Sequence, residues 1–153
     1  MHHIKQRLSY FLGISILAFG GLKFVEPFSG WYSRQISLSG MPNEAYWLGI
    51  FGEIFIGLFL IWGTQSWHPI PNLKLRASLL LLASGGLAVT MAVATWVHLH
   101  PQVPAEVLPL KIKPPIIPLV FLVGSFLNIW FILNRFGGTT NHFETLLKKL
   151  SRY

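Results

Sequence analysis

The sequence predicts an all-α integral membrane protein: a four-helix bundle with up-down topology and a short C-terminal interfacial helix. Hydrophobic residues make up 52% of the 153 positions and charged residues only 11%. The mean hydropathy is +0.54, which is too apolar for a soluble domain of this length. The apolar residues also gather in four runs, each reaching the roughly 18 residues that a membrane-spanning helix needs.

We expect the four spans at about 8–26, 44–63, 75–98 and 115–134, within one transmembrane domain covering 1–153. The first run follows basic residues, as a signal peptide does. No small-residue cleavage site follows it, so we expect a helix of the mature protein. No polar segment between the spans is long enough to build a second core.

Two connections on one side of the bundle are rich in helix-breaking residues. Segment 26–43 holds two prolines and two glycines around Trp31 and Tyr32, and is typical of an interfacial loop that is partly re-entrant. Segment 98–113 and the start of the last span together hold six of the ten prolines. Because proline fixes φ and lacks an N–H donor, we expect this segment to be extended and stiff.

The C-terminal segment 141–152 follows a break at Gly137 and Gly138. Asn141 with Glu144 three residues later predicts a helix start of the capping-box type. Its apolar residues fall on one face and its basic residues elsewhere, which favours a helix lying on anionic lipid. A frayed, solvated tail is the alternative, since isolated helices this short are marginally stable.

The distribution of basic residues predicts the orientation. Eight lysines and arginines belong to the side that carries both termini and four to the other side, so we expect both termini in the cytoplasm and the chain in the inner membrane as a multi-pass protein. The net charge of +7 is divided among short loops. Lipid headgroups of the bilayer are therefore the expected counter-charge, and no nucleic-acid partner is expected.

Several classes of chemistry are excluded by residue type. The chain has no cysteine, which removes disulfide exchange, thiolate nucleophiles, iron–sulfur clusters and thiol-ligated zinc. No catalytic triad, phosphate loop or dinucleotide fingerprint occurs at a convincing spacing. Haem ligation by His98 needs a second axial histidine at similar depth, whereas His68 and His142 belong to the other face. We expect neither a metal nor an intrinsic cofactor.

Two ionisable residues stand inside apolar runs, where lipid penalises either one alone: Lys23 near the end of the first run and Glu53 as the tenth residue of 44–63. Their Cα atoms are expected to differ in height by roughly 9 Å at 1.5 Å per residue, which two long side chains can bridge. We therefore predict that they pair. The pair is either functional, as a proton-relay carboxylate or a polar anchor for a quinone headgroup or lipid, or structural, setting helix register.

Small and polar residues should mark the inward helix faces, because helices in lipid associate where backbones approach closely. Gly49, Glu53 and Gly57 share one face of the second span. In the fourth span Gly124, Ser125 and Asn128 cluster similarly. We assign Asn128 to one polar core with Lys23 and Glu53.

A second set of polar residues is expected at the outer end of the bundle: Glu26, His98, His100, Glu106, Lys111 and Lys113. The functional interpretation is a docking site for an anionic headgroup or a partner protein, and the alternative is ordinary contact with lipid phosphate. His98 and His100 can reach one metal only if the helix ends at His98, so a hydrated interfacial pair is favoured over a metal site.

The pattern of Arg7 before the first span, Gly20-Gly21-Leu22-Lys23-Phe24 at its end and Gly52-Glu53-Ile54-Phe55-Ile56-Gly57 in the second resembles the DoxX-like family of small four-helix membrane proteins. The resemblance covers 7–134 and rests on Gly21, Lys23, Glu53 and Gly57. It implies a small subunit associated with a quinone-linked oxidoreductase, as in thiosulfate oxidation, or a protein of methylamine utilisation. More distant relatives are assembly chaperones. It assigns no catalytic residue, and the proline-rich segment around His98 departs from the family pattern.

We therefore expect an inner-membrane accessory subunit of a quinone-linked oxidoreductase or redox-stress complex. If it takes part in catalysis, it does so as an oxidoreductase subunit with a bound quinone and a partner's cofactor. The alternative is a non-enzymatic membrane assembly factor or scaffold. A small transporter is disfavoured, because four short helices leave little room for a pathway unless the chain forms a homo-oligomer.

Overall fold

The structure, a computed structural model, describes the backbone of residues 2–65 and 73–150 and the side chains of residues 6–65 and 74–134. All regular structure within these residues is helical, which confirms the predicted all-α class. In chain order the elements are α1 (His2–Leu22), α2 (Phe28–Leu38), α3 (Glu44–Thr64), α4 (Leu73–Leu99), the 3₁₀ turns η1 (Ala105–Val107) and η2 (Pro109–Lys111), and α5 (Ile116–Leu150).

Three segments are long and apolar enough to cross a membrane: Glu44–Thr64, Lys74–Leu99 and Ile116–Asn134. Each approaches or exceeds the roughly 20 residues that match a bilayer core at 1.5 Å per residue. Large hydrophobic side chains on these helices are exposed at the protein surface, as a lipid-facing surface requires. These features support a multi-pass membrane protein. The first span, on α1, stays a prediction.

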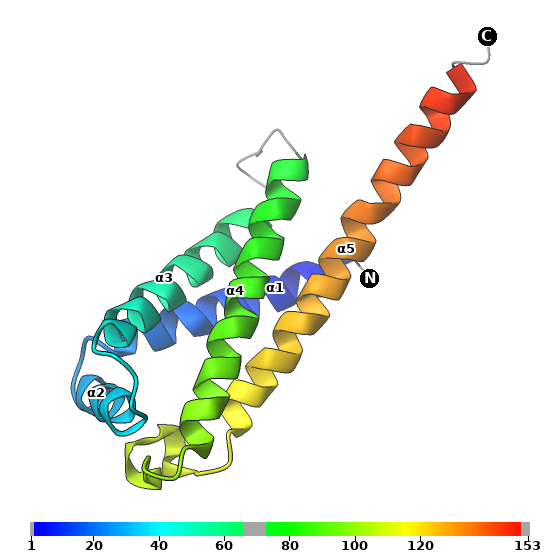
Figure 1. Cartoon of the computed structure of the whole chain (residues 1–153). Coiled ribbons are helices and arrows are strands. Elements are labelled where there is room, and N and C mark those ends of the chain that lie inside the picture. Colours follow the sequence, from blue (N-terminus) through cyan, green and yellow to red (C-terminus); the bar gives the residue numbers. More distant parts are fainter. Residues whose placement is uncertain (1, 66–72, 151–153) are drawn as a thin grey trace.

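The four long helices form two packed pairs. Helix α1 lies along α3 and helix α4 lies along α5, while α3 also contacts α4 and α1 contacts α5. Figure 1 shows the α1 and α3 pair crossing the α4 and α5 pair obliquely. Successive long helices alternate in direction, as an up-down order predicts. The two pairs diverge toward the end of the molecule where α2 lies.

Glycines allow α1 and α3 to approach closely. A Cβ atom on Gly57 would lie 2.7 Å from the Cβ of Leu17 and 2.8 Å from the carbonyl oxygen of Gly13, so only hydrogen fits there. Gly20 likewise faces Glu53 and Ile54. The prediction that small residues mark the inward faces holds for this pair, because close backbone contact replaces the hydrophobic force that lipid removes.

Segment 28–38 forms a helix, and the expectation of an interfacial loop between 26 and 43 was wrong there. Phe28, Trp31, Tyr32, Gln35 and Ile36 follow the i, i+3, i+4, i+7, i+8 spacing of one helix face. Proline and glycine suggested a loop. However, Pro27 precedes the helix, where its missing N–H costs nothing, and Gly30 lies in its first turn.

Segment 98–113 is compact, although the sequence predicted an extended chain. Its buried residues Val103, Val107 and Leu108 pack with Val97 of α4 against Trp31, Leu38 and Met41 of the α2 region. The ammonium group of Lys113 donates hydrogen bonds to the carbonyl oxygens of His100 and Val103. The prolines are accommodated in turns, and burial of these side chains holds the segment against α2.

Helix α5 continues without a break to Leu150, so the predicted separate C-terminal helix after Gly137 and Gly138 was wrong. Each glycine in a helix interior costs only about 1 kcal/mol relative to alanine. The helical backbone tolerates the pair. The last predicted tail residues, 151 and 152, lie outside the described residues, and the predicted contact with lipid is untested.

Candidate functional site

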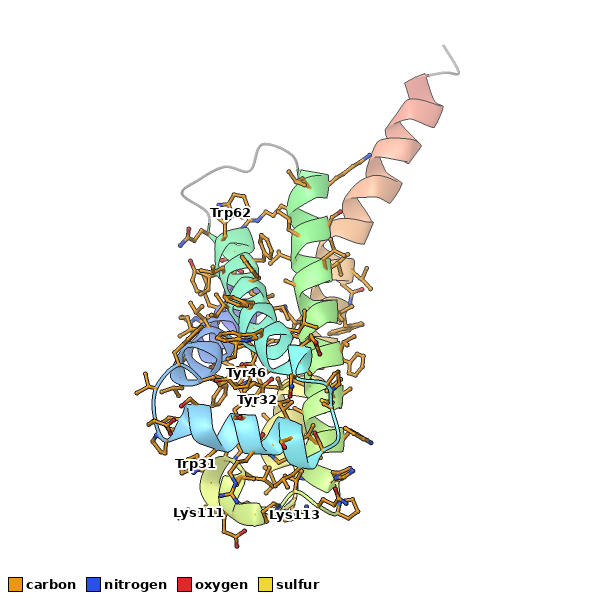
Figure 2. All side chains as sticks on the ribbon, turned by 60° about the vertical axis from the view of Figure 1, so that its left-hand side comes forward. Trp31, Tyr32, Tyr46, Trp62, Lys111 and Lys113 are labelled. Carbon is orange, nitrogen blue, oxygen red and sulfur yellow. The ribbon has the colours of Figure 1, made fainter. Side chains whose placement is uncertain are left out.

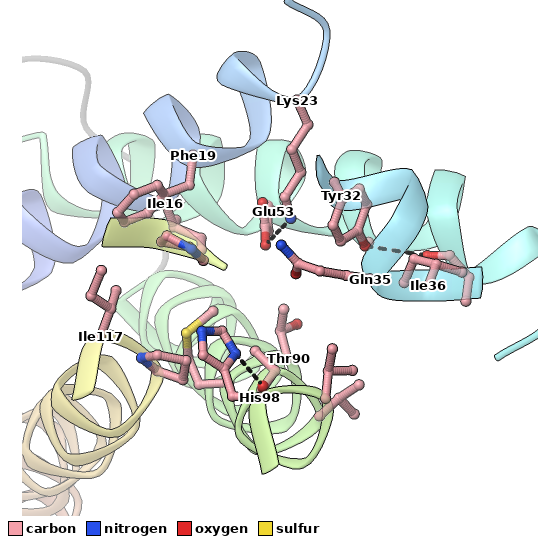
Figure 3. Close-up of a pocket in the computed structure, with 18 of the residues that line it drawn as sticks. Ile16, Phe19, Lys23, Tyr32, Gln35, Ile36, Glu53, Thr90, His98 and Ile117 are labelled. Carbon is pink, nitrogen blue, oxygen red and sulfur yellow. Dashed lines mark hydrogen bonds and ion pairs between the residues drawn. The ribbon is translucent and has the colours of Figure 1, made fainter. Parts of the chain in front are cut away.

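A cavity of about 600 Å³ lies between the diverging helix pairs. All five helices contribute to its wall, which is mainly apolar (Figure 3). Ligand sites in proteins commonly have volumes of about 300–1,000 Å³, with an apolar lining and a few polar groups. The cavity therefore has the size and character of a site for a small apolar molecule.

The cavity exists because α3 and α4 are in contact along only part of their length. Gly63 packs against Leu80, and Gly86 packs against Ile56. Beyond these contacts the helices separate, and α2 and segment 98–113 close the open end (Figure 1). Gln35 of α2 donates a hydrogen bond from Nε2 to the carbonyl oxygen of Val107, which fastens the two closing segments together.

The predicted ion pair between Lys23 and Glu53 is present in the cavity wall. Lys23 Nζ lies 2.6 Å from Glu53 Oε1, and the side chains are 16% and 7% exposed. Lys23 comes just after α1 and Glu53 from the middle of α3 (Figure 3). Glu53 lies in a segment that is long and apolar enough to cross a membrane, where little water solvates a charge, so the carboxylate depends on Lys23.

Tyr32 of α2 also contacts the Lys23 ammonium group. Lys23 Nζ lies 3.8 Å from the centroid of its ring, within the range of a cation–π interaction. The ring is admitted by Gly49, where a Cβ atom would lie 1.8 Å from the Tyr32 hydroxyl. Burial, and after it the negative charge of Glu53, raises the pKa of Tyr32, so this hydroxyl stays protonated.

The second carboxylate oxygen of Glu53 has unused hydrogen-bonding capacity. Oε2 is buried and has no hydrogen-bond partner within the part of the chain that the structure describes. Leaving a buried acceptor unpaired costs about 1–3 kcal/mol, and more for a charged group. The atom is enclosed by protein, so a ligand in the cavity contacts it only if neighbouring side chains move.

His98 belongs to the cavity wall, which corrects the expectation of a hydrated interfacial pair with His100. The His98 side chain is buried, and its Nδ1 lies 2.8 Å from the carbonyl oxygen of Ala94. A carbonyl only accepts, so Nδ1 carries the hydrogen and Nε2 of the neutral ring is an acceptor. His100 instead contacts the Trp96 ring, with 5.3 Å between centroids.

Asn128 lies in a different part of the fold from the ion pair. It accepts a hydrogen bond from Ser9 Oγ at 2.7 Å and donates one to Ser84 Oγ at 2.9 Å. Ser9 and Lys23 are fourteen residues apart on the α1 segment, or about 21 Å at 1.5 Å per residue. The single polar core expected from the sequence is therefore two sites, and Asn128 links α1, α4 and α5.

The remaining outer-face residues do not form one cluster. Figure 2 shows Lys111 and Lys113 at the end of the molecule opposite Trp62. Lys113 donates hydrogen bonds to backbone carbonyls, and Glu26 accepts a hydrogen bond from Ser29. Glu106 and Lys111 are exposed. Among the described residues, no group of three or more histidine and acidic side chains could hold a metal ion.

Sequence reasoning missed Tyr32, Gln35 and Thr90 as parts of the cavity wall. The helical spacing of residues 28–36 was the signal that could have identified the first two. Gly21 of the recognised motif has open space around it, and Gly20 makes the packing contact with α3 instead. Comparison of the chain with family models, curated proteins and solved structures gives no match in any of the three.

Proposed function

We propose that the chain binds a lipid-soluble molecule with a polar head, of the quinone class, in the cavity beside Lys23 and Glu53. In this proposal it is a DoxX-like four-span protein of the inner membrane, with both termini in the cytoplasm. It serves as an accessory subunit of a quinone-linked oxidoreductase or redox-stress complex. The observation that carries the proposal is a buried ion pair, with one unpartnered carboxylate oxygen, in the wall of a 600 Å³ apolar cavity.

The cavity favours a ligand-binding role for the ion pair over a purely structural one. A pair that only sets helix register is best packed tightly, with every polar atom satisfied. Here the carboxylate lines an open volume and one of its oxygens lacks a partner. Ionisable residues at bilayer depth mark functional sites in most membrane proteins. A molecule with an apolar ring and a polar substituent matches both parts of the wall.

Access from the bilayer is supported by three residues that line the cavity and also lie on the outer surface. Leu48 of α3 is 73% exposed, and Val89 and Val93 of α4 are 66% and 42% exposed. They lie where α3 and α4 separate. A lipid-soluble ligand can therefore enter sideways between these helices without crossing water.

The chemistry of the side chains supports an accessory role. The chain has no cysteine, so electrons cannot pass through a thiol or thiol-ligated cluster of its own. A quinone held here would exchange electrons with a cofactor carried by a partner. The exposed charges of Glu106 and Lys111, at the end where α2 closes the cavity, are available for that contact.

The test is purification of the full chain in a mild detergent, followed by solvent extraction, an absorption spectrum for quinone and mass spectrometry of co-purifying chains. We expect quinone in the wild-type extract, its loss in Glu53→Gln, and its retention in Glu44→Gln, an exposed carboxylate on the same helix. A wild-type extract without quinone, or equal quinone in Glu53→Gln, would refute the proposal.

The second candidate, an assembly factor or scaffold, is favoured by the tight contact at Gly57 and by the buried link through Asn128. Both hold helices together without contributing to the cavity. This candidate predicts a co-purifying partner chain and no small molecule in the same extract. The two outcomes are therefore separable in one preparation.

A further inference from the structure

We infer that the cavity holds its ligand through an oxygen atom of an uncharged head, which accepts hydrogen bonds from Lys23, just after α1, and from Gln35 of α2. This inference rests on the proposed function of the same site and adds the two residues that bind the head and the charge that the head must have. Carbonyl and hydroxyl oxygens both accept hydrogen bonds, so quinone and quinol heads both meet this requirement.

Lys23 supplies the first donor. Its ammonium group has three N–H bonds. One is directed at Glu53 Oε1, which lies 2.6 Å from Nζ, and the group also lies 3.8 Å from the centroid of the Tyr32 ring. When each of these contacts uses one N–H bond, the third has no acceptor within the part of the chain that the structure describes. Because Lys23 lines the cavity, an oxygen atom of a bound ligand can be that acceptor.

Gln35 supplies the second donor. Its Nε2 atom has two N–H bonds, of which one goes to the carbonyl oxygen of Val107. The other N–H bond has no acceptor among the described residues, and Gln35 also lines the cavity. Figure 3 shows the amide end of Gln35 extending from α2 toward the pair formed by Lys23 and Glu53. The two donors therefore lie in the same part of the cavity wall.

Glu53 acts on the ligand through Lys23. Its Oε2 atom is enclosed by protein, so the carboxylate contributes by holding the cation in place. A lysine at the end of a membrane helix otherwise extends toward the headgroups. The bond of 2.6 Å to Glu53, in the middle of α3, keeps the ammonium group at the cavity instead. Glu53 is therefore a positioning residue for the donor.

The charges of the cavity wall disfavour an ionic head. Of the described acidic, lysine and arginine side chains, Lys23 and Glu53 are the two that line the cavity, and their charges balance each other. A carboxylate or phosphate head would bring an unbalanced charge into a mainly apolar volume, where the loss of its hydration is costly. An uncharged oxygen uses the same two donors without that cost.

The first experiment observes the hydrogen bonds directly. Decyl-1,4-benzoquinone with carbon-13 at both carbonyl positions is added to the full chain in lipid nanodiscs, and the infrared difference from the unlabelled quinone isolates the carbonyl stretching band. Because a hydrogen bond weakens the carbonyl double bond, we expect the bound quinone to absorb at a lower frequency than the same quinone in empty nanodiscs. An unshifted band for the bound quinone would overturn the inference.

The second experiment compares affinities by isothermal titration calorimetry in the same nanodiscs, with empty nanodiscs to correct for partition into lipid. The three probes share a six-membered ring and a decyl chain: decyl-1,4-benzoquinone, decylbenzene and 4-decylbenzoate. We expect the quinone to bind at least about tenfold more tightly than decylbenzene, which is about 1.4 kcal/mol and close to one hydrogen bond with a charged group. We expect 4-decylbenzoate, with its anionic head, to bind more weakly than the quinone.

Two variants assign the donors. Gln35→Met keeps a side chain of similar length without N–H bonds, and should move the carbonyl band back toward its position in empty nanodiscs. The combined variant Lys23→Met with Glu53→Leu removes both charges together and should also raise the band frequency. Val103→Ala is the matched control for Gln35→Met. Val103 is fully buried in segment 98–113 and absent from the cavity lining, so its truncation loosens that segment while Gln35 keeps its donors, and the band should stay shifted.

The outcomes separate this inference from the proposed function. Equal affinities for the quinone and decylbenzene, or tighter binding of 4-decylbenzoate than of the quinone, overturn the inference while binding in the cavity stands. A carbonyl band that keeps its full shift in Gln35→Met overturns it as well. If the quinone does not bind the wild-type chain at all, the proposed function fails and the inference with it. The comparison among probes uses the wild-type chain alone, so a misfolded variant does not prevent a decision.

Discussion

Breaking the ion pair from either side should have unequal consequences, because the two charges lie at different depths. Lys23 follows the last residue of α1 and is 16% exposed, so after Glu53→Leu its ammonium group can turn toward the headgroups. Glu53 lies in the middle of α3 and is 7% exposed. After Lys23→Met, the Glu53 carboxylate cannot turn toward the headgroups in this way.

The expected magnitudes follow from this asymmetry. Lys23→Met removes one partner of a buried pair and should lower the free energy of unfolding by about 3–5 kcal/mol. Glu53→Leu should lower it by about 1–3 kcal/mol, the cost of an unsatisfied polar group. The double variant replaces both charges with apolar groups of similar volume and should lie within about 1 kcal/mol of wild type. The coupling energy is then at least about 3 kcal/mol.

The assay is equilibrium unfolding in mixed micelles, with the helical signal followed by circular dichroism as the fraction of denaturing detergent increases. Lys111→Met is the control, since Lys111 is exposed and surface substitutions usually change stability by less than about 0.5 kcal/mol. A double variant as unstable as the sum of the two single variants would refute the reasoning, because the two residues would then act independently.

Three further predictions concern the close contacts and the buried phenol. Gly57→Ala should lower the free energy of unfolding by about 1–3 kcal/mol, because its new Cβ atom would lie 2.7 Å from Leu17 and must push α1 away from α3. Gly52→Ala is the control: its Cβ atom enters open space, so stability in the same assay should be unchanged or slightly higher. Equal losses in the two variants would contradict the packing argument. Gly49→Ala should displace Tyr32, whose hydroxyl lies 1.8 Å from the added atom, and weaken quinone-class binding in nanodiscs; unchanged affinity would mean that Tyr32 does not shape the cavity. Because burial raises the pKa of Tyr32, its neutral form contributes stability that is present below about pH 10 and is lost as the pH rises from there toward the raised value. Tyr32→Phe should reduce this alkaline loss in unfolding measured against pH, and an unchanged pH dependence would argue against it.

Much of the helical framework and the ion pair could be predicted from the sequence because both depend on short-range patterns. A long apolar run must satisfy its own backbone in lipid, which requires a helix. Two opposite charges in such runs stabilise each other far more than lipid stabilises either one, so an ion pair between Lys23 and Glu53 was strongly favoured. Gly57, which the sequence placed on the inward face of the second span, lies where α3 contacts α1.

The cavity and the residues that line it could not be predicted in this way. His98 appeared in the sequence only as a residue near a helix end, and Asn128 only as a polar residue on an inward face. Whether either joins Glu53 depends on how the helix pairs cross. That crossing is decided by contacts between residues far apart in the chain, such as Gly63 with Leu80.

The sequence by itself indicated that this protein lies in a membrane, that it is helical and that Lys23 pairs with Glu53. The reason is that long apolar runs and isolated charges can adopt few stable arrangements in lipid. Only the tertiary structure decided that segment 28–38 forms a helix, that 98–113 packs against it, and that the diverging helix pairs leave a cavity with Glu53 and His98 on opposite sides. The physical reason is that proline and glycine permit several local conformations, and burial against distant side chains selects one.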